Sequence, residues 1–208
     1  MNKPDIILWD WDNTLINTRF IAAKALRRLG EETNVSVSEN DITEVIGGHL
    51  VDFWYRHYGD NPLAELKRFI AYYQELNHAA TLFPETKEIL SFVKESGIPQ
   101  MVISNKNEDI LIEEAERFGL TSYFQKVVGT IGNGIAKPTK EFADFALGKE
   151  WPKNILMIGD GQSDMQFAKT LGAFGLLIRD ESIPTDFDYD KRVSNLSETL
   201  TFLKEHLK

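Results

Sequence analysis

The chain has 208 residues, of which 42% are hydrophobic and 26% charged, so it can bury a sizeable core in one domain or in a domain with an insert. Its formal charge of −9 is spread along the chain, which argues against a nucleic-acid backbone as the main partner. Cysteine is absent, and this excludes disulfides, thiolate catalysis and cysteine-ligated zinc.

The apolar segments are all short. The start of the chain, MNKPDIILWDWDN, lacks an apolar run of signal-peptide length, and no uninterrupted apolar run is long enough to cross a bilayer. We therefore expect a cytoplasmic protein without a membrane partner. The sequence does not decide the oligomeric state.

The first strand and the segment after it differ in character. Residues 5–10 (DIILWD) are almost continuously apolar, which is typical of a parallel strand buried on both faces. Residues 16–81 show helical periodicity in RFIAAKALRRLG and LAELKRFIAYYQELNHAA and no convincing strand. They indicate a helical insert, with hinges expected at 16–18 and 81–84.

From residue 85 onward, apolar runs alternate with helical patterns. Glycines or polar residues mark where each helix ends or begins. In chain order we expect helix 85–96 before Gly97, strand 98–105 (IPQMVISN), helix 108–118 before Gly119, a weaker strand 126–130 (KVVGT), strand 154–160 (NILMIGD), a helix through Met165, Ala168 and Leu171 ending near Gly172, a weaker strand 175–180 (GLLIRD), and a last helix capped by Ser197.

This alternation predicts an α/β fold. Its parallel sheet would be covered by helices on both sides and built with right-handed crossovers. Residues 1–15 and 82–208 would form the sheet domain and residues 16–81 the insert. Ligands of such sheets bind at the carboxyl ends of the strands. The polar residues that end the three best strands, Asp10, Ser104 and Asp160, should therefore gather along one edge.

Asp10 and Asp12 stand two positions apart at the end of the first strand. Two carboxylates near one point can share a hard cation such as Mg²⁺, which prefers oxygen ligands and keeps several waters. Such pairs are also frequent in turns, where aspartate accepts hydrogen bonds from nearby amides. Taken alone, the pair leaves both interpretations open.

Four downstream residues favour the chemical interpretation. Ser104 offers a hydroxyl, Lys137 an ammonium, and Asp160 and Asp164 further carboxylates. Acids with a cation, a hydroxyl and a lysine at one sheet edge suit a phosphoryl group. Each residue also has a structural alternative: Ser104 can cap a turn, Lys137 can be solvated, and Asp164 can cap the helix that follows it.

These residues resemble the four motifs of the haloacid dehalogenase superfamily of hydrolases, in the same order. DWDNTL resembles the first motif, Ser104 the second, Lys137-Pro138 the third and GDGQSD the fourth. The segments FPETKEILSFVKESGI and SNKNEDILIEEAERFGLTSYFQKVVG further resemble the phosphoglycolate phosphatase-like branch. The resemblance implies a Rossmann-like core with a small α-helical cap inserted after the first strand, where residues 16–81 lie.

The resemblance also implies a mechanism. Asp10 would be the nucleophile that forms an aspartyl-phosphate, and Asp12 would be the general acid and then the general base. Mg²⁺ would be held by the Asp10 side chain, the Asp12 backbone carbonyl and Asp160, with Asp164 in support. Thr14 would hold the turn by hydrogen bonding.

Phosphate binding would fall to Ser104, Asn105 and Lys137. The implied substrate is a phosphate monoester of a small metabolite, since relatives that cleave halides or phosphonates usually lack the acid at Asp12. Asn13 departs from the family pattern, which usually has glycine there, but asparagine tolerates the left-handed conformation well.

Other functions remain open at this point. Phosphomutases of the same superfamily keep both acids. A phospho-acceptor receiver also gathers acids, a hydroxyl and a lysine, but its phosphorylated aspartate typically lies well downstream of an early acidic pair. A binding module without activity has no separate support in the composition.

Substrate choice would depend on the insert, since a cap that closes over the site contacts the group that carries the phosphate. Within residues 44–60 (EVIGGHLVDFWYRHYGD), His49 and Arg56 are our candidates for binding polar groups of the substrate. The alternative is that the aromatic residues of this segment only pack the insert and leave its basic residues in solvent.

Overall fold

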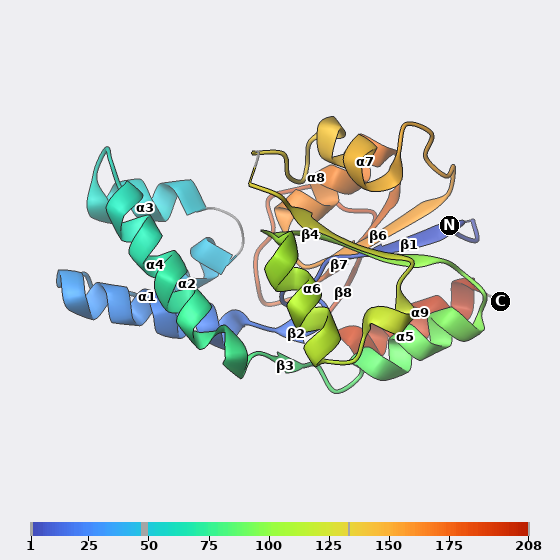
Figure 1. Ribbon diagram of the computed structural model, residues 1–208, viewed down its shortest axis with the longest axis horizontal. Helices are drawn as coiled ribbons and strands as arrows, with labels where there is room; N and C mark the ends of the chain where they lie inside the picture. Colours follow the sequence, from blue (N-terminus) through green and yellow to red (C-terminus); the bar gives the residue numbers. More distant parts are fainter. Residues whose placement is uncertain (1, 47–49, 133, 208) are drawn as a thin grey trace. The chain divides into compact units, whose positions relative to one another are not determined.

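The computed structural model describes residues 2–46, 50–132 and 134–207 (Figure 1). The chain divides into two compact units, Met1–Leu15 with Leu82–Lys208 and Ile16–Thr81. Within the described ranges, no helix combines the length and the apolar character that a membrane crossing requires.

The larger unit is built on a parallel sheet. Among the described residues its strand order is β5-β4-β1-β6-β7-β8, and neighbouring strands pair in parallel. The strands span β1 Ile6–Trp9, β4 Gln100–Asn107, β5 Lys126–Thr130, β6 Ile155–Gly159, β7 Phe174–Ile178 and β8 Lys191–Val193. β1 lies between β4 and β6, with Leu8 in register with Met101 on one side and Met157 on the other.

Helices cover both faces of this sheet, with α7 and α8 on one face and α5 and α9 on the other (Figure 1). A core of buried apolar side chains from β1, β4, β6, α7 and α8 includes Leu8, Phe142 and Phe167. Burial of such side chains provides the main stabilisation of a layered α/β domain. The elements of this unit that lie outside the sheet are α5 Thr86–Glu95, α6 Glu108–Arg117, η2 Thr121–Tyr123, α7 Lys140–Leu147, α8 Gln162–Leu171 and α9 Leu196–His206.

The predicted α/β class is confirmed, and the five predicted strands correspond to β1, β4, β5, β6 and β7. The expected cap of the last helix is wrong. Asn195, not Ser197, is the N-cap of α9, and its side chain accepts a hydrogen bond from the backbone N–H of Glu198. β8 is an additional edge strand that the sequence analysis did not predict.

The smaller unit is mainly helical. Its helices are α1 Arg19–Thr33, α2 Glu39–Ile46, α3 Leu50–Tyr58, α4 Leu63–Leu76 and η1 Asn77–Ala79. Their apolar faces share a core that includes Leu26, Phe53 and Phe69. Two very short strands, β2 Ile16–Asn17 and β3 Thr81–Leu82, pair with each other at the expected hinges. The expectation that this segment contains no strand is therefore wrong. The two strands were missed because two residues are too few to produce a recognisable pattern.

Candidate functional site

Three polar residues meet at the carboxyl edge of the sheet. Asp10 directly follows β1, Ser104 lies in β4, and Asp160 directly follows β6. Because β4, β1 and β6 are neighbours in the sheet, the strands bring these residues to one place, as the alternation of strands and helices predicts.

Asp10 is fixed by the strand before it and by the turn after it. Its backbone N–H donates to the carbonyl of Ile158 in β6 at 2.8 Å. The hydroxyl of Thr14 donates to Asp10 Oδ2 at 3.2 Å, which is the turn-holding contact expected for Thr14. Asn13 adopts a φ of 58°, in the left-handed region where asparagine is one of the better tolerated residues. The turn therefore leaves Asp10 buried with a defined orientation.

Lys137 is buried and touches two acids. Its Nζ donates to Asp10 Oδ1 at 2.7 Å, to Asp164 Oδ1 at 2.5 Å and to the carbonyl of Ile103 at 2.9 Å. Its side chain is 1% exposed. The three donors of the ammonium are therefore all used inside the protein.

Asp164 has two structural tasks. It lies in the first turn of α8, where its Oδ2 accepts a hydrogen bond from the N–H of Gly161 at 3.0 Å, while Oδ1 contacts Lys137. The helix-capping alternative therefore describes a real contact, and the same carboxylate also pairs with Lys137. Glycine at 159 makes room for it, because a Cβ there would lie 2.4 Å from the Asp164 carboxylate.

Asn105 and Ser104 shape the same edge through backbone contacts. Asn105 Oδ1 accepts a hydrogen bond from the backbone N–H of Lys137 at 2.8 Å. Ser104 Oγ accepts one from the N–H of Lys106 at 3.1 Å, so the turn-capping alternative for Ser104 describes a real contact. A serine hydroxyl keeps its own proton for donation to a further acceptor.

The electrostatics of the cluster are dominated by burial and by like charges. Burial raises the pKa of Asp10, the charge of Asp164 raises it further, and Lys137 lowers it, with a net pKa of about 7. Burial and the charges of Asp10 and Asp164 raise the pKa of Asp160 well above its usual value. Burial alone would lower the pKa of Lys137, but the charges of Asp10 and Asp164 outweigh it and raise that pKa.

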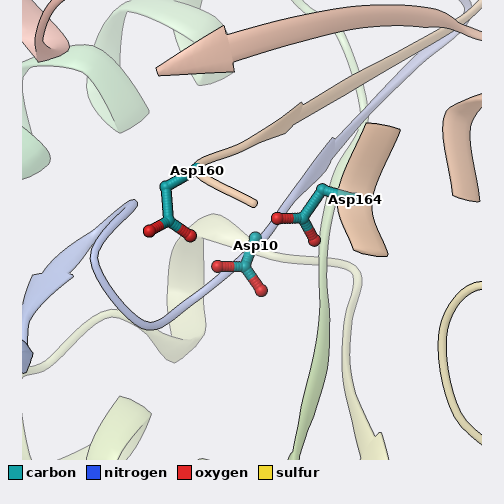
Figure 2. A group of neighbouring side chains, drawn as sticks. All are labelled: Asp10, Asp160 and Asp164. Carbon is teal, nitrogen blue, oxygen red and sulfur yellow. The ribbon is translucent and has the colours of Figure 1, made fainter. Parts of the chain in front are cut away.

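A divalent cation fits this group. Carboxylate oxygens of Asp10, Asp160 and Asp164 lie within 4.8 Å of one another, and Figure 2 shows the three side chains beside one another. Ligands about 2.1 Å from Mg²⁺ lie at most about 4.2 Å apart across the ion, so small side-chain adjustments suffice. The positive charges of Lys137 and Arg179 oppose those of the three acids, and a hard cation with two charges would add to this compensation.

A second charged cluster was not predicted from the sequence. Lys106 Nζ lies 2.8 Å from Asp12 Oδ1 and 2.8 Å from Glu114 Oε2, and the indole of Trp11 donates to that same Glu114 oxygen at 2.6 Å. Burial alone would lower the pKa of Lys106, but Asp12 and Glu114 outweigh it and raise that pKa. One signal was present: Glu114 is an acid in the apolar stripe of α6 formed with Leu111 and Ala115.

The candidate substrate-binding residues of the insert have different outcomes. His49 lies outside the described residues. Arg56 donates to Asp41 Oδ1 at 2.9 Å and also pairs with Glu44. Phe53 and Trp54 are buried in the core of the insert, as the packing alternative predicts.

One family model matches most of the chain, and curated relatives match over similar lengths. The sequence model described as "Haloacid dehalogenase-like hydrolase" matches residues 7–177. A phosphoglycolate phosphatase from Aquifex aeolicus is 26% identical over 186 residues, which cover 80% of this chain and 81% of that protein. The pyrophosphatase PpaX from Oceanobacillus iheyensis is 24% identical over 210 residues, or 95% of each chain.

A solved structure shows the same fold. The crystal structure of a predicted phosphoglycolate phosphatase from Haemophilus somnus aligns with a TM-score of 0.74 at 22% identity and covers 97% of this chain and 99% of its own. An α/β core with this sheet is therefore shared between the two chains.

Proposed function

The chain belongs to the haloacid dehalogenase-like hydrolases, and from this premise we propose that it is a Mg²⁺-dependent phosphatase that hydrolyses a small phosphate monoester through an aspartyl-phosphate. The observation that carries the proposal is the different pairing of the two acids of the first motif. Asp10 contacts Lys137, whereas Asp12 contacts Lys106. Two carboxylates with separate partners can perform two different tasks.

Asp10 is the proposed nucleophile. One of its carboxylate oxygens attacks phosphorus, and the bond between phosphorus and the ester oxygen breaks. Lys137 holds Asp10 at 2.7 Å and offsets negative charge as two anionic groups approach each other. Thr14 holds the second carboxylate oxygen, so the nucleophile is oriented before the substrate arrives.

Asp12 is the proposed general acid and base. It gives its proton to the leaving alcohol and then accepts a proton from the water that attacks the aspartyl-phosphate. Its side chain is 27% exposed, so water and substrate can reach it. Asp10, at 9% side-chain exposure, is better shielded.

Mg²⁺ would be held by the side chains of Asp10 and Asp160 and by the backbone carbonyl of Asp12, with Asp164 in support. When bound, the ion would neutralise charge on the phosphoryl oxygens. Ser104, Asn105 and Lys137 are the proposed phosphate-binding residues.

The proposed substrate is a small phosphorylated molecule. Relatives bear the names phosphoglycolate phosphatase and pyrophosphatase, which makes phosphoglycolate and inorganic pyrophosphate the first compounds to test. His49 and Arg56 remain the proposed specificity residues of the insert. Replacing Arg56 by lysine should change the ratio of kcat/KM values among substrates more than it changes Mg²⁺ affinity. Unchanged ratios would contradict a role of Arg56 in substrate specificity and leave it only the structural role of its ion pairs.

The test is phosphate release from a panel of small phosphate esters and pyrophosphate, with and without Mg²⁺. We expect Mg²⁺-dependent release from at least one compound and its loss in Asp10→Asn. The matched control Asp188→Asn removes a carboxylate whose side chain is 97% exposed and should behave as wild type. No release from any compound would contradict the proposal, and transfer of phosphate to a second alcohol without release would indicate a mutase instead.

A further inference from the structure

A network of hydrogen bonds and ion pairs links Trp11, Glu114 and Lys106 to Asp12. Trp11 is fully buried, and its indole N–H donates to Glu114 Oε2 at 2.6 Å. Glu114 accepts two hydrogen bonds from Lys106 Nζ, at 2.9 and 2.8 Å. Lys106 Nζ also donates to Asp12 Oδ1 at 2.8 Å. Each member is thus held by the one before it.

This network places charged groups in the interior of the protein, which lowers the free energy of unfolding. The side chain of Lys106 is 7% exposed and that of Glu114 is 3% exposed. Buried ion pairs lose much of their hydration, and replacing them with apolar side chains of similar volume is often neutral or stabilising. Stability alone therefore does not account for a lysine and a glutamate here. Their contact with Asp12 points to a task in the reaction.

We propose that Lys106 is a positioning residue for Asp12 and that Glu114 holds Lys106 in place for this task; the inference rests on the proposed phosphatase function. A lysine ammonium has donors only. It therefore holds the Asp12 carboxylate by Oδ1 and sets the direction in which this side chain presents its proton. Because Glu114 takes two bonds from the same ammonium, the direction of Lys106 toward Asp12 is fixed.

The position matters in both halves of the reaction. In the first, an oxygen of Asp10 bonds to phosphorus, the bond to the ester oxygen breaks with its electron pair on that oxygen, and the proton on Asp12 passes to it. In the second, the oxygen of a water molecule bonds to phosphorus, its proton passes to Asp12, and the bond to Asp10 breaks to restore the carboxylate. A misdirected Asp12 slows proton transfer without removing the nucleophile.

The test compares two substrates that differ in their need for the acid. An alkyl phosphate that the wild type hydrolyses needs its leaving oxygen protonated, whereas the p-nitrophenolate of p-nitrophenyl phosphate leaves with little help. The variant is Lys106→Met with Glu114→Gln, which removes both buried charges and keeps an oxygen acceptor for Trp11. We expect kcat/KM for the alkyl phosphate to fall about 10- to 100-fold and that for the aryl phosphate to fall less than about threefold.

Further variants keep the result decisive. If the double variant does not fold, Glu114→Gln alone, which loosens Lys106 but keeps it, should show the same preference for the aryl substrate with a smaller loss. Lys169→Met removes a lysine that is 81% exposed and should leave both substrates unchanged. Equal losses on the two substrates, or no loss in either, would overturn the positioning role.

Failure of the underlying function is recognised separately. If the wild type releases phosphate from neither substrate, the phosphatase proposal fails; if Asp10→Asn keeps turnover of both, its aspartyl-phosphate mechanism at Asp10 fails. If Asp10→Asn is inactive but the change at 106 and 114 affects both substrates equally, only the role of Lys106 fails.

Discussion

Lys137 Nζ lies 2.7 Å from Asp10 Oδ1, although the two residues are 127 positions apart in the chain. The contact joins the loop before α7 to the end of β1. It places an ammonium in a group of carboxylates whose mutual repulsion would otherwise oppose folding. The stability of the fold and the chemistry of the site therefore depend on the same pair.

Lys137→Met should destabilise the metal-free protein. At about pH 8 we expect the free energy of unfolding to fall by about 3 kcal/mol, because the variant leaves buried carboxylates without their counter-charge. The loss should be smaller at about pH 5, where these acids can be protonated. Denaturant unfolding measures both values. Lys140→Met is the matched control, since Lys140 is 67% exposed in its pair with Asp144 and its loss should cost less than about 0.5 kcal/mol. Equal effects of the two substitutions would contradict this description of Lys137.

Mg²⁺ affinity should rise with pH through the neutral range. The pKa of Asp10 is about 7 without metal, since burial and the Asp164 charge raise it, so the metal-free site holds a proton below that pH. The ion binds the deprotonated acid and must displace its proton, so affinity should rise with pH below about pH 7, by about tenfold per pH unit for each proton released. Calorimetry in buffers of different ionisation enthalpy would detect the released proton. An affinity that does not change with pH would contradict the raised pKa.

The same shift has a consequence for stability. The pKa of Asp10 in the folded protein lies above its value of about 4 in the unfolded chain. At a pH between these two values, the folded protein therefore binds one more proton at Asp10 than the unfolded chain does. This contribution to stability is present below about pH 4 and is lost as the pH rises to about 7. Saturating Mg²⁺ should reduce the loss. Unfolding curves over this range, with and without Mg²⁺, would test both statements, and a metal-free slope unchanged by Asp10→Asn would contradict the assignment to Asp10.

The pKa of Asp41 is shifted downward, so its contribution to stability depends on pH in the opposite direction to that of Asp10. Its burial would raise the pKa, but hydrogen bonds from Ser38 and His57 outweigh this effect and lower the pKa to about 2. The ionised Asp41 carboxylate therefore contributes fully to the stability of the fold above about pH 4, the pKa of aspartate in the unfolded chain. This contribution is lost as the pH falls toward 2. Asp41→Asn should cost about 2 kcal/mol at neutral pH, measured by denaturant unfolding of the protein. The control Asp188→Asn should cost almost nothing, and a loss as large as that of Asp41→Asn would contradict the special role of Asp41.

Asn13 should tolerate glycine better than alanine. Its φ of 58° is unfavourable for a residue with a Cβ and costs about 1 kcal/mol or more for most residues. Asn13→Gly should therefore leave the free energy of unfolding nearly unchanged, whereas Asn13→Ala should lower it by about 1 kcal/mol. Thermal unfolding of both variants measures this difference. An alanine variant as stable as the glycine variant would show that the conformation of this turn is not limiting.

The sequence predicted the elements whose pattern is local. β1, β4 and β6 were recognisable because strands buried on both faces are almost continuously apolar. β8 was not, because Lys191–Val193 is three residues long and begins with two basic residues. β2 and β3 were not predicted either, because each is only two residues long. The N-cap of α9 was misplaced by two residues, since Asn195 and Ser197 both suit that position by residue type.

Within the site, the sequence identified residues whose types and order form known motifs, and the strand order places Asp10, Ser104 and Asp160 together. It did not reveal the contacts of Lys106, whose partner Asp12 lies 94 positions away. The bond between Trp11 and Glu114 spans 103 positions. Contacts of this kind arise because α6 packs against β4 and β5 and meets the turn that follows β1, which no local pattern records.

The central claim is that Asp10 carries the phosphoryl group during turnover. The most direct test is to quench the protein with acid while it hydrolyses a substrate in the presence of Mg²⁺ and to locate the phosphorylated residue by peptide mass spectrometry. We predict a phosphoryl adduct on Asp10 that is absent from the folded Asp10→Asn variant. An adduct on another residue, or undiminished phosphate release by Asp10→Asn, would contradict the proposed mechanism.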